Sequence, residues 1–304
     1  MSVRGRYAPS PTGETHLGNA STALLAWLSA RSQQGAFVMR MEDLDRPRVV
    51  AGAAQRILDD LRWLGLDWDE GPDVGGPHAP YSQSERAALY DAAFETLRAC
   101  GTLYPCFCSR KDIQSAASAP QSPGDEARYP GTCRGLDAGT VSSRIGAGAP
   151  HAWRFCVDPA KVAPFVDRVR GRYAPQPETI GDFVVRRADG VPAYQLAVVV
   201  DDIAMELTEV VRGDDLLPST LRQLLVYDAM GAALPEFAHV PLLVGDDGVR
   251  LSKRHQGTAI RQMRESGLSA EMIVGRLAHH HGLRPTAAPV AARELIDGFR
   301  LGPR

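Results

Sequence analysis

The sequence lacks the long apolar stretches that membrane insertion and secretion require. No run of about eighteen consecutive apolar residues occurs in it, and its first residues contain no apolar core of a signal peptide. We therefore expect a cytoplasmic protein that has no membrane partner.

The sequence also lacks an excess of charge of either sign. Its formal net charge is −2 over 304 residues, which excludes a generally basic binder of polyanions. Any contact with RNA must then be made by a local patch. The length allows one large domain with an insertion, or two modest domains.

Cysteine is scarce, and its count is odd. Of the five cysteines, three lie close together in the sequence as Cys106, Cys108 and Cys133. In a cytoplasmic chain such a cluster favours a metal site over disulfides. Two thiolates one residue apart on a turn can face one Zn²⁺, and a third can follow after a loop. Spacing alone leaves three candidates for a fourth ligand: His151, Cys156 and Tyr129.

The sequence does contain a distinctive loop at residues 7–19, which leads into leucines at helical spacing. Two prolines fix an extended approach and two glycines let the backbone come close to a ligand: Pro9, Pro11, Gly13 and Gly18. The start of a helix offers unpaired N–H groups and the positive end of the helix dipole. Phosphate is therefore the expected ligand, with His16 and Ser10 as additional donors.

This loop resembles the HIGH-type signature of class I aminoacyl-tRNA synthetases in its glutamate-specific form. The matching residues are Arg6, the A-P-S-P-T-G run of residues 8–13, and His16 with Gly18. The resemblance implies an α/β fold with a Rossmann-type parallel sheet. It also implies that the loop binds ATP through Pro9, Ser10, Gly13, His16, Gly18 and Asn19.

A second segment, residues 36–45, fits the same family. Its apolar part predicts a buried parallel strand that ends in an acidic run. Ligands of open parallel sheets lie beyond the carboxyl ends of the strands, which puts Glu42 at the same edge as the loop. The segment matches the R-x-E-D-x-D pattern of glutamate-specific synthetases, in which the first glutamate binds the amino group of the substrate. The next helix is expected to run from Asp45 to Leu64.

The second half of the sheet is expected to begin at residue 191. Residues 191–202 are apolar and rich in β-favouring side chains, and residues 203–211 are expected to continue as a strand or hairpin. A helix near 219–230 and a further strand over 237–244 complete this half.

Two positions in this half match glutamate-binding patterns of the family. Tyr194 lies in Y-x-L-A-x-x-x-D-D, and Arg212 lies in V-x-R-G-x-D-L. A guanidinium fork can bind a carboxylate at two points and reject the neutral amide of glutamine. The resemblance implies that these two residues bind glutamate together with Arg6, Ala8, Ser10 and Glu42. The sequence does not show which of the two carboxylates of glutamate binds Arg6 and which binds Arg212.

The run from Arg250 to His255 resembles the second family signature, the KMSKS-type loop. Lys253 takes the position of the second lysine, and Arg250 replaces the first. The resemblance implies that Leu251, Ser252 and Lys253 contact ATP. His16 and Lys253 are the expected catalytic residues, which together with Mg²⁺ would neutralise the charge that grows on the phosphoryl oxygens.

The resemblance also implies a zinc ligand set. Short glutamyl-transferring relatives of the synthetases show a C-x-C…Y-x-x-x-C pattern, which this chain repeats at Cys106, Cys108, Tyr129 and Cys133. One structural Zn²⁺ is then expected. Arginine clusters at 168–172 and 186–187 are either solvated surface or ligands for RNA phosphates.

Four segments are expected along the chain. Residues 1–105 and 191–248 form the halves of a nucleotide-binding catalytic domain, and residues 106–190 form an insertion that binds zinc and the acceptor. Residues 249–304 form the second signature loop and a short helical stem. Because so few residues follow that loop, we expect no anticodon-binding domain.

The resemblance covers residues 4–264 and points to short paralogues of the glutamyl-tRNA synthetases. These activate L-glutamate with ATP and transfer it to the queuosine base in the anticodon loop of tRNA(Asp); a monomer is expected. One alternative is a truncated synthetase that charges a tRNA 3′ end, against which the missing domain argues. A non-catalytic RNA-binding paralogue is disfavoured by the intact signatures, and a general nucleotidyltransferase explains neither the paired arginines nor the cysteine cluster.

Overall fold

A computed structural model describes residues 2–109, 111–113, 129–176, 179–243 and 259–302. The first part of the chain contains β1 Arg4–Tyr7, α1 Leu17–Ser32, β2 Ala36–Met39, α2 Ala53–Trp63, α3 Ala87–Ala99, β3 Leu103–Cys106, α5 Ala138–Gly146 and β4 Ala152–Phe155. The second part contains β5 Phe165–Asp167, β6 Gly171–Tyr173, β7 Phe183–Arg186, α6 Tyr194–Ala204, β8 Glu209–Gly213, α7 Leu217–Ala229, β9 Glu236–Val240, α8 Ile260–Glu265 and α9 Ala270–His280.

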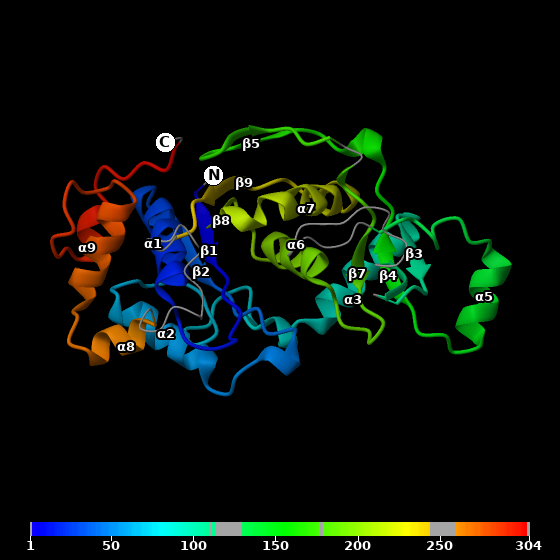
Figure 1. Ribbon diagram of the computed structural model, residues 1–304, viewed down its shortest axis with the longest axis horizontal. Coiled ribbons are helices and arrows are strands. Elements are labelled where there is room, and N and C mark those ends of the chain that lie inside the picture. Colours follow the sequence, from blue (N-terminus) through cyan, green and yellow to red (C-terminus); the bar gives the residue numbers. More distant parts are fainter. Residues whose placement is uncertain (1, 110, 114–128, 177–178, 244–258, 303–304) are drawn as a thin grey trace.

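Two pairs of parallel strands form the centre of the molecule (Figure 1). Strand β1 pairs with β2, and β8 pairs with β9. The two pairs lie side by side, because the N–H of Thr208 donates to the Arg4 carbonyl at 3.0 Å. This confirms the predicted α/β class, although among the described residues each parallel sheet contains only two strands.

Helix α1 packs against β1, β2 and β8 and is buried along nearly its whole length. Small alanines and serines alternate with leucines in it, so the helix can approach the strands closely on one side and the C-terminal helices on the other. A first hydrophobic core lies here, and a second lies around α3, α6 and α7. The carboxyl ends of β1, β2 and β8 lie between the two cores.

The helix predicted from Asp45 to Leu64 is wrong in its first third. A short 3-10 turn covers Arg46–Arg48, and α2 begins only at Ala53. Val49 is extended, and Gly52 has a φ of +71°, which breaks the helix that Pro47 had started.

The strand predicted over residues 191–202 is also wrong, because residues from Tyr194 onward form helix α6. Every residue from Leu196 to Asp202 is buried, so the helix has no polar face in this stretch. A helix that is apolar all round shows no 3.6-residue period, and three consecutive valines then imitate a buried strand. The second half of the sheet starts later, at β8.

The insertion adds a separate antiparallel sheet and a hairpin. Strands β4 and β7 of the insertion form the sheet together with β3, which ends the preceding segment, and β5 and β6 form the hairpin. Figure 1 shows the hairpin lying over β9, to which it is joined by the N–H of Arg168 and the carbonyl of Phe237 at 2.9 Å. The hairpin therefore belongs to the insertion by sequence but touches the central strands.

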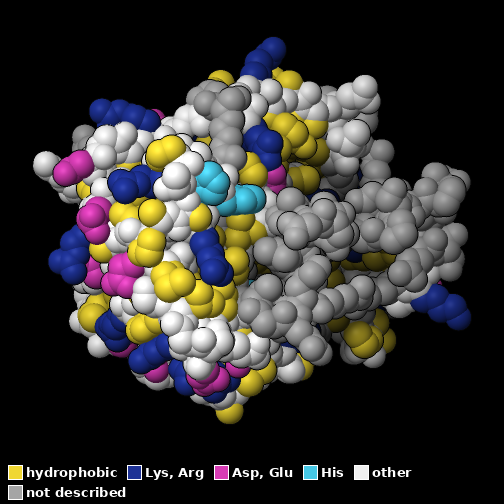
Figure 2. All heavy atoms as spheres, turned by 60° about the vertical axis from the view of Figure 1, so that its left-hand side comes forward, with side chains coloured by type: hydrophobic (Ala, Val, Ile, Leu, Met, Phe, Trp, Pro, Cys, Tyr) yellow, Lys and Arg dark blue, Asp and Glu magenta, His cyan; other side chains and the backbone are white. Residues whose placement is uncertain are grey.

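Helices α8 and α9 cover the outer side of α1. Ile273 and Leu277 enter the first core, and His281 lies 2.6 Å from the Ser21 hydroxyl. On the face drawn in Figure 2, the described side chains of both charges are interspersed with hydrophobic ones. No helix in the described part of the chain is long and apolar enough to span a membrane.

Candidate active site

The first signature loop runs from the end of β1 to the start of α1. Gly13 has a φ of +150°, a value that glycine accommodates best. His16 lies at the cap position of α1 in an extended conformation, and its side chain does not cap the helix. The first N–H groups of α1 therefore have no cap from this residue and remain oriented for an anion.

The described chain resumes at Ala259, beside the first signature loop. Ala259 forms a β-bridge with His16, and the N–H of Ile260 donates to the Thr15 carbonyl at 2.8 Å. Leu251, Ser252 and Lys253 lie outside the described residues. The residues that follow this signature in the chain, Ala259 and Ile260, lie against the first signature loop.

Two buried arginines lie at the ends of β1 and β8. Arg6 donates through Nη1 to the Val211 carbonyl at 3.0 Å, and its Nε lies 4.0 Å from Asp202. Arg212 donates through Nε to His239 at 3.0 Å and through Nη2 to Thr220 at 2.7 Å. Both arginines are at most 5% exposed.

Each of these arginines keeps a buried donor without a hydrogen-bond partner among the described residues. The two atoms are Nε of Arg6 and Nη1 of Arg212. An unpaired N–H of a buried cation is costly, so such groups in a native protein call for an acceptor. An anionic ligand, above all a carboxylate, supplies that acceptor.

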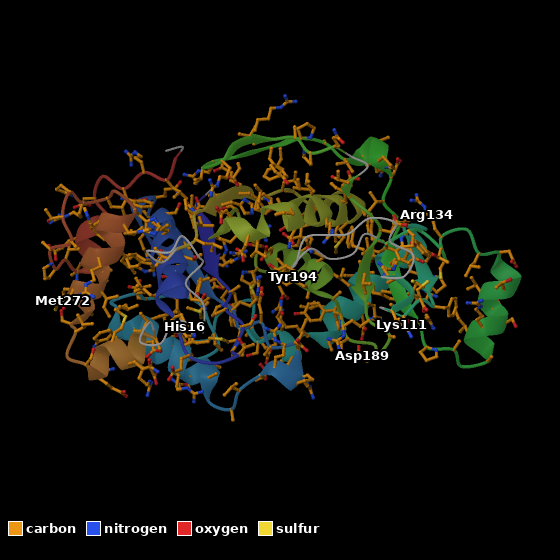
Figure 3. The ribbon with its side chains drawn as sticks, in the orientation of Figure 1. His16, Lys111, Arg134, Asp189, Tyr194 and Met272 are labelled. Carbon is orange, nitrogen blue, oxygen red and sulfur yellow. The ribbon has the colours of Figure 1, made fainter. Side chains whose placement is uncertain are left out.

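Tyr194 and Glu42 face the same pair of arginines. Burial raises the pKa of Tyr194 and Glu42 raises it further, while Arg212 and Arg6 lower it. The phenol is therefore a neutral donor, and the ring still keeps 38% of its surface exposed. Figure 3 shows Tyr194 near the middle of the molecule, with His16 nearer α1. Tyr194 is therefore accessible to solvent although charged side chains surround it.

Glu42 follows β2 and is anchored on both sides. Its N–H donates to the Pro9 carbonyl at 3.0 Å, and its carboxylate accepts from Arg40 at 3.3 Å. Burial raises the pKa of Glu42, and Arg40 and Arg6 act in the opposite direction. A carboxylate that is mostly enclosed but still 11% exposed is a suitable partner for an ammonium group.

The structure thus brings together Arg6, Glu42, Tyr194 and Arg212, as the sequence predicted. Ala8 and Ser10 follow β1 directly and lie on the same loop. Sequence reasoning missed the side chains behind Arg212: Asp167, Thr220 and His239, all of them buried. A polar residue inside an apolar strand, as at His239, was the available signal.

The cysteine cluster lies at the end of β3, which Figure 1 shows well apart from β1 and β8. The Sγ atoms of Cys106, Cys108 and Cys133 all lie within 4.8 Å of one another. The Tyr129 hydroxyl lies 3.4 Å from the Cys106 sulfur and 3.8 Å from the Cys108 sulfur. Ligands held at about 2.0–2.3 Å in a tetrahedral zinc site are separated by similar distances, so these residues fit the ion.

The other two candidates for a fourth ligand have partners outside the cysteine cluster. His151 has its Nδ1 3.0 Å from the Ala149 carbonyl and packs between Phe107 and Trp153. Cys156 has its pKa raised by burial and lies near Arg134, so its surroundings differ from those of the other three thiols. The geometry therefore favours Tyr129.

Most arginines of the insertion already have acidic partners. Arg168 pairs with Glu209, Arg170 with Asp214, and Arg186 with Asp91. Arg187 also pairs, with Asp45 and Asp189. These pairs favour the reading of the clusters as structural and surface charges over that of free phosphate ligands.

Comparison with known proteins gives the same assignment over almost the whole chain. Residues 2–296 match the family model of the catalytic domain of class I tRNA synthetases of the E and Q type. The chain is 52% identical to the glutamyl-Q tRNA(Asp) synthetase of Symbiobacterium thermophilum, covering 98% of this chain and 92% of the relative. It is 49% identical to the protein of the same name from Nitratidesulfovibrio vulgaris, covering 97% and 91%.

A solved structure agrees with the sequence relatives. The glutamate-tRNA synthetase of Elizabethkingia anophelis superposes with a TM-score of 0.87 at 32% identity, covering 99% of this chain and 66% of that one. The chain therefore belongs to the class I tRNA synthetases of the glutamate and glutamine type and, within them, to the glutamyl-Q tRNA(Asp) synthetase family.

Proposed function

We propose that this protein activates L-glutamate with ATP and transfers it to the queuosine base in the anticodon loop of tRNA(Asp). The choice of glutamate as the amino acid rests on two buried N–H groups without hydrogen-bond partners in the described part of the chain, one on Arg6 and one on Arg212. Both arginines face Glu42 and Tyr194. The acceptor is inferred from the family, whose members match this chain over nearly their full length.

In the first half-reaction, the α-carboxylate of glutamate attacks the α-phosphorus of ATP. The bond to the β-phosphate oxygen breaks, pyrophosphate leaves, and glutamyl-adenylate forms. The helix start at α1, His16 and Lys253 bind the phosphates and stabilise the charge of the transition state. Mg²⁺ bound with ATP would neutralise further phosphate charge.

In the second half-reaction, a hydroxyl on the cyclopentene ring of queuosine attacks the activated carbonyl. An ester bond forms, AMP leaves, and the hydroxyl proton passes to solvent or to the phosphate of AMP. Residues 106–190 hold the acceptor beside residues 1–105 and 191–248. We place the reaction in the cytoplasm and take the protein to act as a monomer.

Within the insertion, Cys106, Cys108, Cys133 and Tyr129 would hold one structural Zn²⁺. Burial raises the pKa of Cys108 to about 11, so a bound cation is what would keep that thiol ionised. Metal analysis of the purified protein should find about one zinc per chain. Cys106→Ser should remove it, whereas the exposed Cys100→Ser should not. A zinc content unaffected by Cys106→Ser would contradict the site.

The acceptor is tested with labelled glutamate and ATP on three RNAs. These are tRNA(Asp) with queuosine, the same tRNA without it, and tRNA(Glu). Label on the queuosine tRNA alone is the expected result. Label on tRNA(Glu) would instead make the protein a charging enzyme, and label on none would require a test of adenylate formation.

A further inference from the structure

The buried side chains behind Arg212 form a connected set that reaches from the glutamate pocket to the β5–β6 hairpin. His239 on β9 lies between Arg212 and Asp167, and it is 0% exposed. Its Nδ1 lies 2.6 Å from Asp167, and its Nε2 lies 3.0 Å from both Arg212 and Thr220. Both ring nitrogens therefore have partners.

The charge state of Asp167 fixes which nitrogen carries the proton. Its carboxylate accepts the backbone N–H groups of Val169, Arg170 and His239 as well as the imidazole. Burial would raise the pKa of Asp167, but these hydrogen bonds outweigh it and hold the pKa below its usual value. An ionised carboxylate only accepts, so the proton of the ring lies on Nδ1.

Nε2 is then an acceptor, which is what Arg212 requires. The Nε–H of Arg212 donates to it, and the Thr220 hydroxyl accepts from Nη2 of the same guanidinium. Burial lowers the pKa of His239, although Asp167 acts in the opposite direction. A neutral ring avoids placing a second cation against the arginine.

We propose that Asp167 and His239 are positioning residues, which hold the guanidinium of Arg212 so that Nη1 remains directed at the substrate carboxylate. The inference rests on the proposed function, because it assigns a purpose to the glutamate-binding arginine. Two of the three nitrogens of Arg212 are used to fix the group, and the third is left for the ligand. A hairpin of the acceptor-binding insertion thereby helps to shape the glutamate pocket.

Asp167→Asn tests the proposal most sharply. The amide oxygen can replace Oδ1, which accepts three backbone N–H groups, so the amide nitrogen would face Nδ1. The ring proton would then move to Nε2, against the Nε–H of Arg212. In ATP–pyrophosphate exchange, the KM for glutamate should rise on the order of ten- to a hundredfold, with the KM for ATP unchanged.

Substitutions of His239 provide the complementary test. His239→Phe keeps a ring beside Phe237 but removes the acceptor, so it should raise the KM for glutamate by a similar factor. His239→Gln can present its amide oxygen where Nε2 was, and it should recover most of the loss. Asp182→Asn is the matched control, because Asp182 is also a buried acceptor of a backbone N–H but lies in the insertion sheet.

The protonation of His239 can be read independently of activity. Nitrogen NMR of the histidine-labelled protein should show the proton on Nδ1 in the wild type and on Nε2 in Asp167→Asn. A wild-type KM for glutamate in Asp167→Asn, or equal changes in the KM for glutamate and ATP, would overturn the proposal. Absence of glutamate-dependent exchange in the wild type would overturn the proposed function instead, whichever tautomer is found.

Discussion

Arg40 and Arg212 are both fully buried, but their partners differ. Arg40 lies 2.7 Å from Asp202, 3.6 Å from Asp201 and 3.3 Å from Glu42, all of them carboxylates. Arg212 has only the neutral His239 and Thr220 as hydrogen-bond partners among the described side chains. The charge of Arg40 is therefore neutralised by carboxylates of the protein, whereas that of Arg212 is left to be neutralised by a bound anion.

The pKa shifts of the two arginines express this difference. Burial would lower the pKa of Arg40, but the carboxylates of Asp202, Asp201 and Glu42 outweigh it and raise the pKa. Burial lowers the pKa of Arg212, and the surrounding charges do not restore it. A buried arginine whose charge is matched by protein carboxylates is part of the structure, while one whose charge is not matched marks a site for an anion.

The largest effect is expected when the neutralised arginine is removed. Arg40→Met leaves Asp201 and Asp202 buried with less compensation, which costs about 3–5 kcal/mol for broken buried pairs. The free energy of unfolding, measured by urea denaturation, should fall by that amount. A loss below about 1 kcal/mol, the value typical of exposed pairs, would contradict the structural role of Arg40.

Removal of Arg212 should lower activity and leave stability unchanged or higher. In Arg212→Met, glutamate-dependent exchange should lose about ten- to a hundredfold in kcat/KM, because a hydrogen bond to a charged group is worth roughly 1.5–3 kcal/mol. Unfolding in urea should match the wild type or occur at a higher concentration, since an unpaired buried cation has been removed. A loss of unfolding free energy as large as that of Arg40→Met would contradict the proposed difference between the two arginines.

The pH dependence sharpens the role of Glu42, which contacts one arginine and faces the other. Because burial raises the pKa of Glu42, its carboxylate takes up a proton at a higher pH than an exposed glutamate does. The kcat/KM for glutamate should therefore fall as the pH decreases through this raised pKa. Glu42→Gln should be about tenfold less active at neutral pH and should lack this acidic decline. If kcat/KM fell in the same way at acidic pH in Glu42→Gln, the decline would have to come from another titrating group.

The smallest effect is expected from Thr220→Val. This substitution keeps the shape of the side chain but removes the hydroxyl that holds Nη2 of Arg212. Loss of one such hydrogen bond should raise the KM for glutamate about three- to tenfold. A KM for glutamate equal to that of the wild type would show that His239 alone fixes the guanidinium.

Sequence patterns predicted which residues would lie together better than they predicted the elements that carry them. Arg6, Glu42, Tyr194 and Arg212 were identified from local motifs, and the structure brings them together. Tyr194 was nevertheless expected in a strand, because every residue of α6 from Leu196 to Asp202 is buried and this stretch has no polar face.

The supporting side chains could not be predicted in the same way. His239 and Asp167 are 72 residues apart in the chain, and no local pattern joins them. Their contact depends on how the hairpin lies over β9, which is decided by tertiary packing. The cysteine cluster was predictable because its residues are few, close in sequence and chemically distinctive.

The most direct test of the account is ATP–pyrophosphate exchange without tRNA, with glutamate or glutamine as the amino acid, in the wild type and in Arg212→Met. In the wild type we expect exchange with glutamate and little with glutamine, and in Arg212→Met we expect loss of the glutamate reaction in a protein that remains folded. Equal exchange with both amino acids, or full glutamate activity in Arg212→Met, would contradict the claim that this buried guanidinium reads the substrate carboxylate.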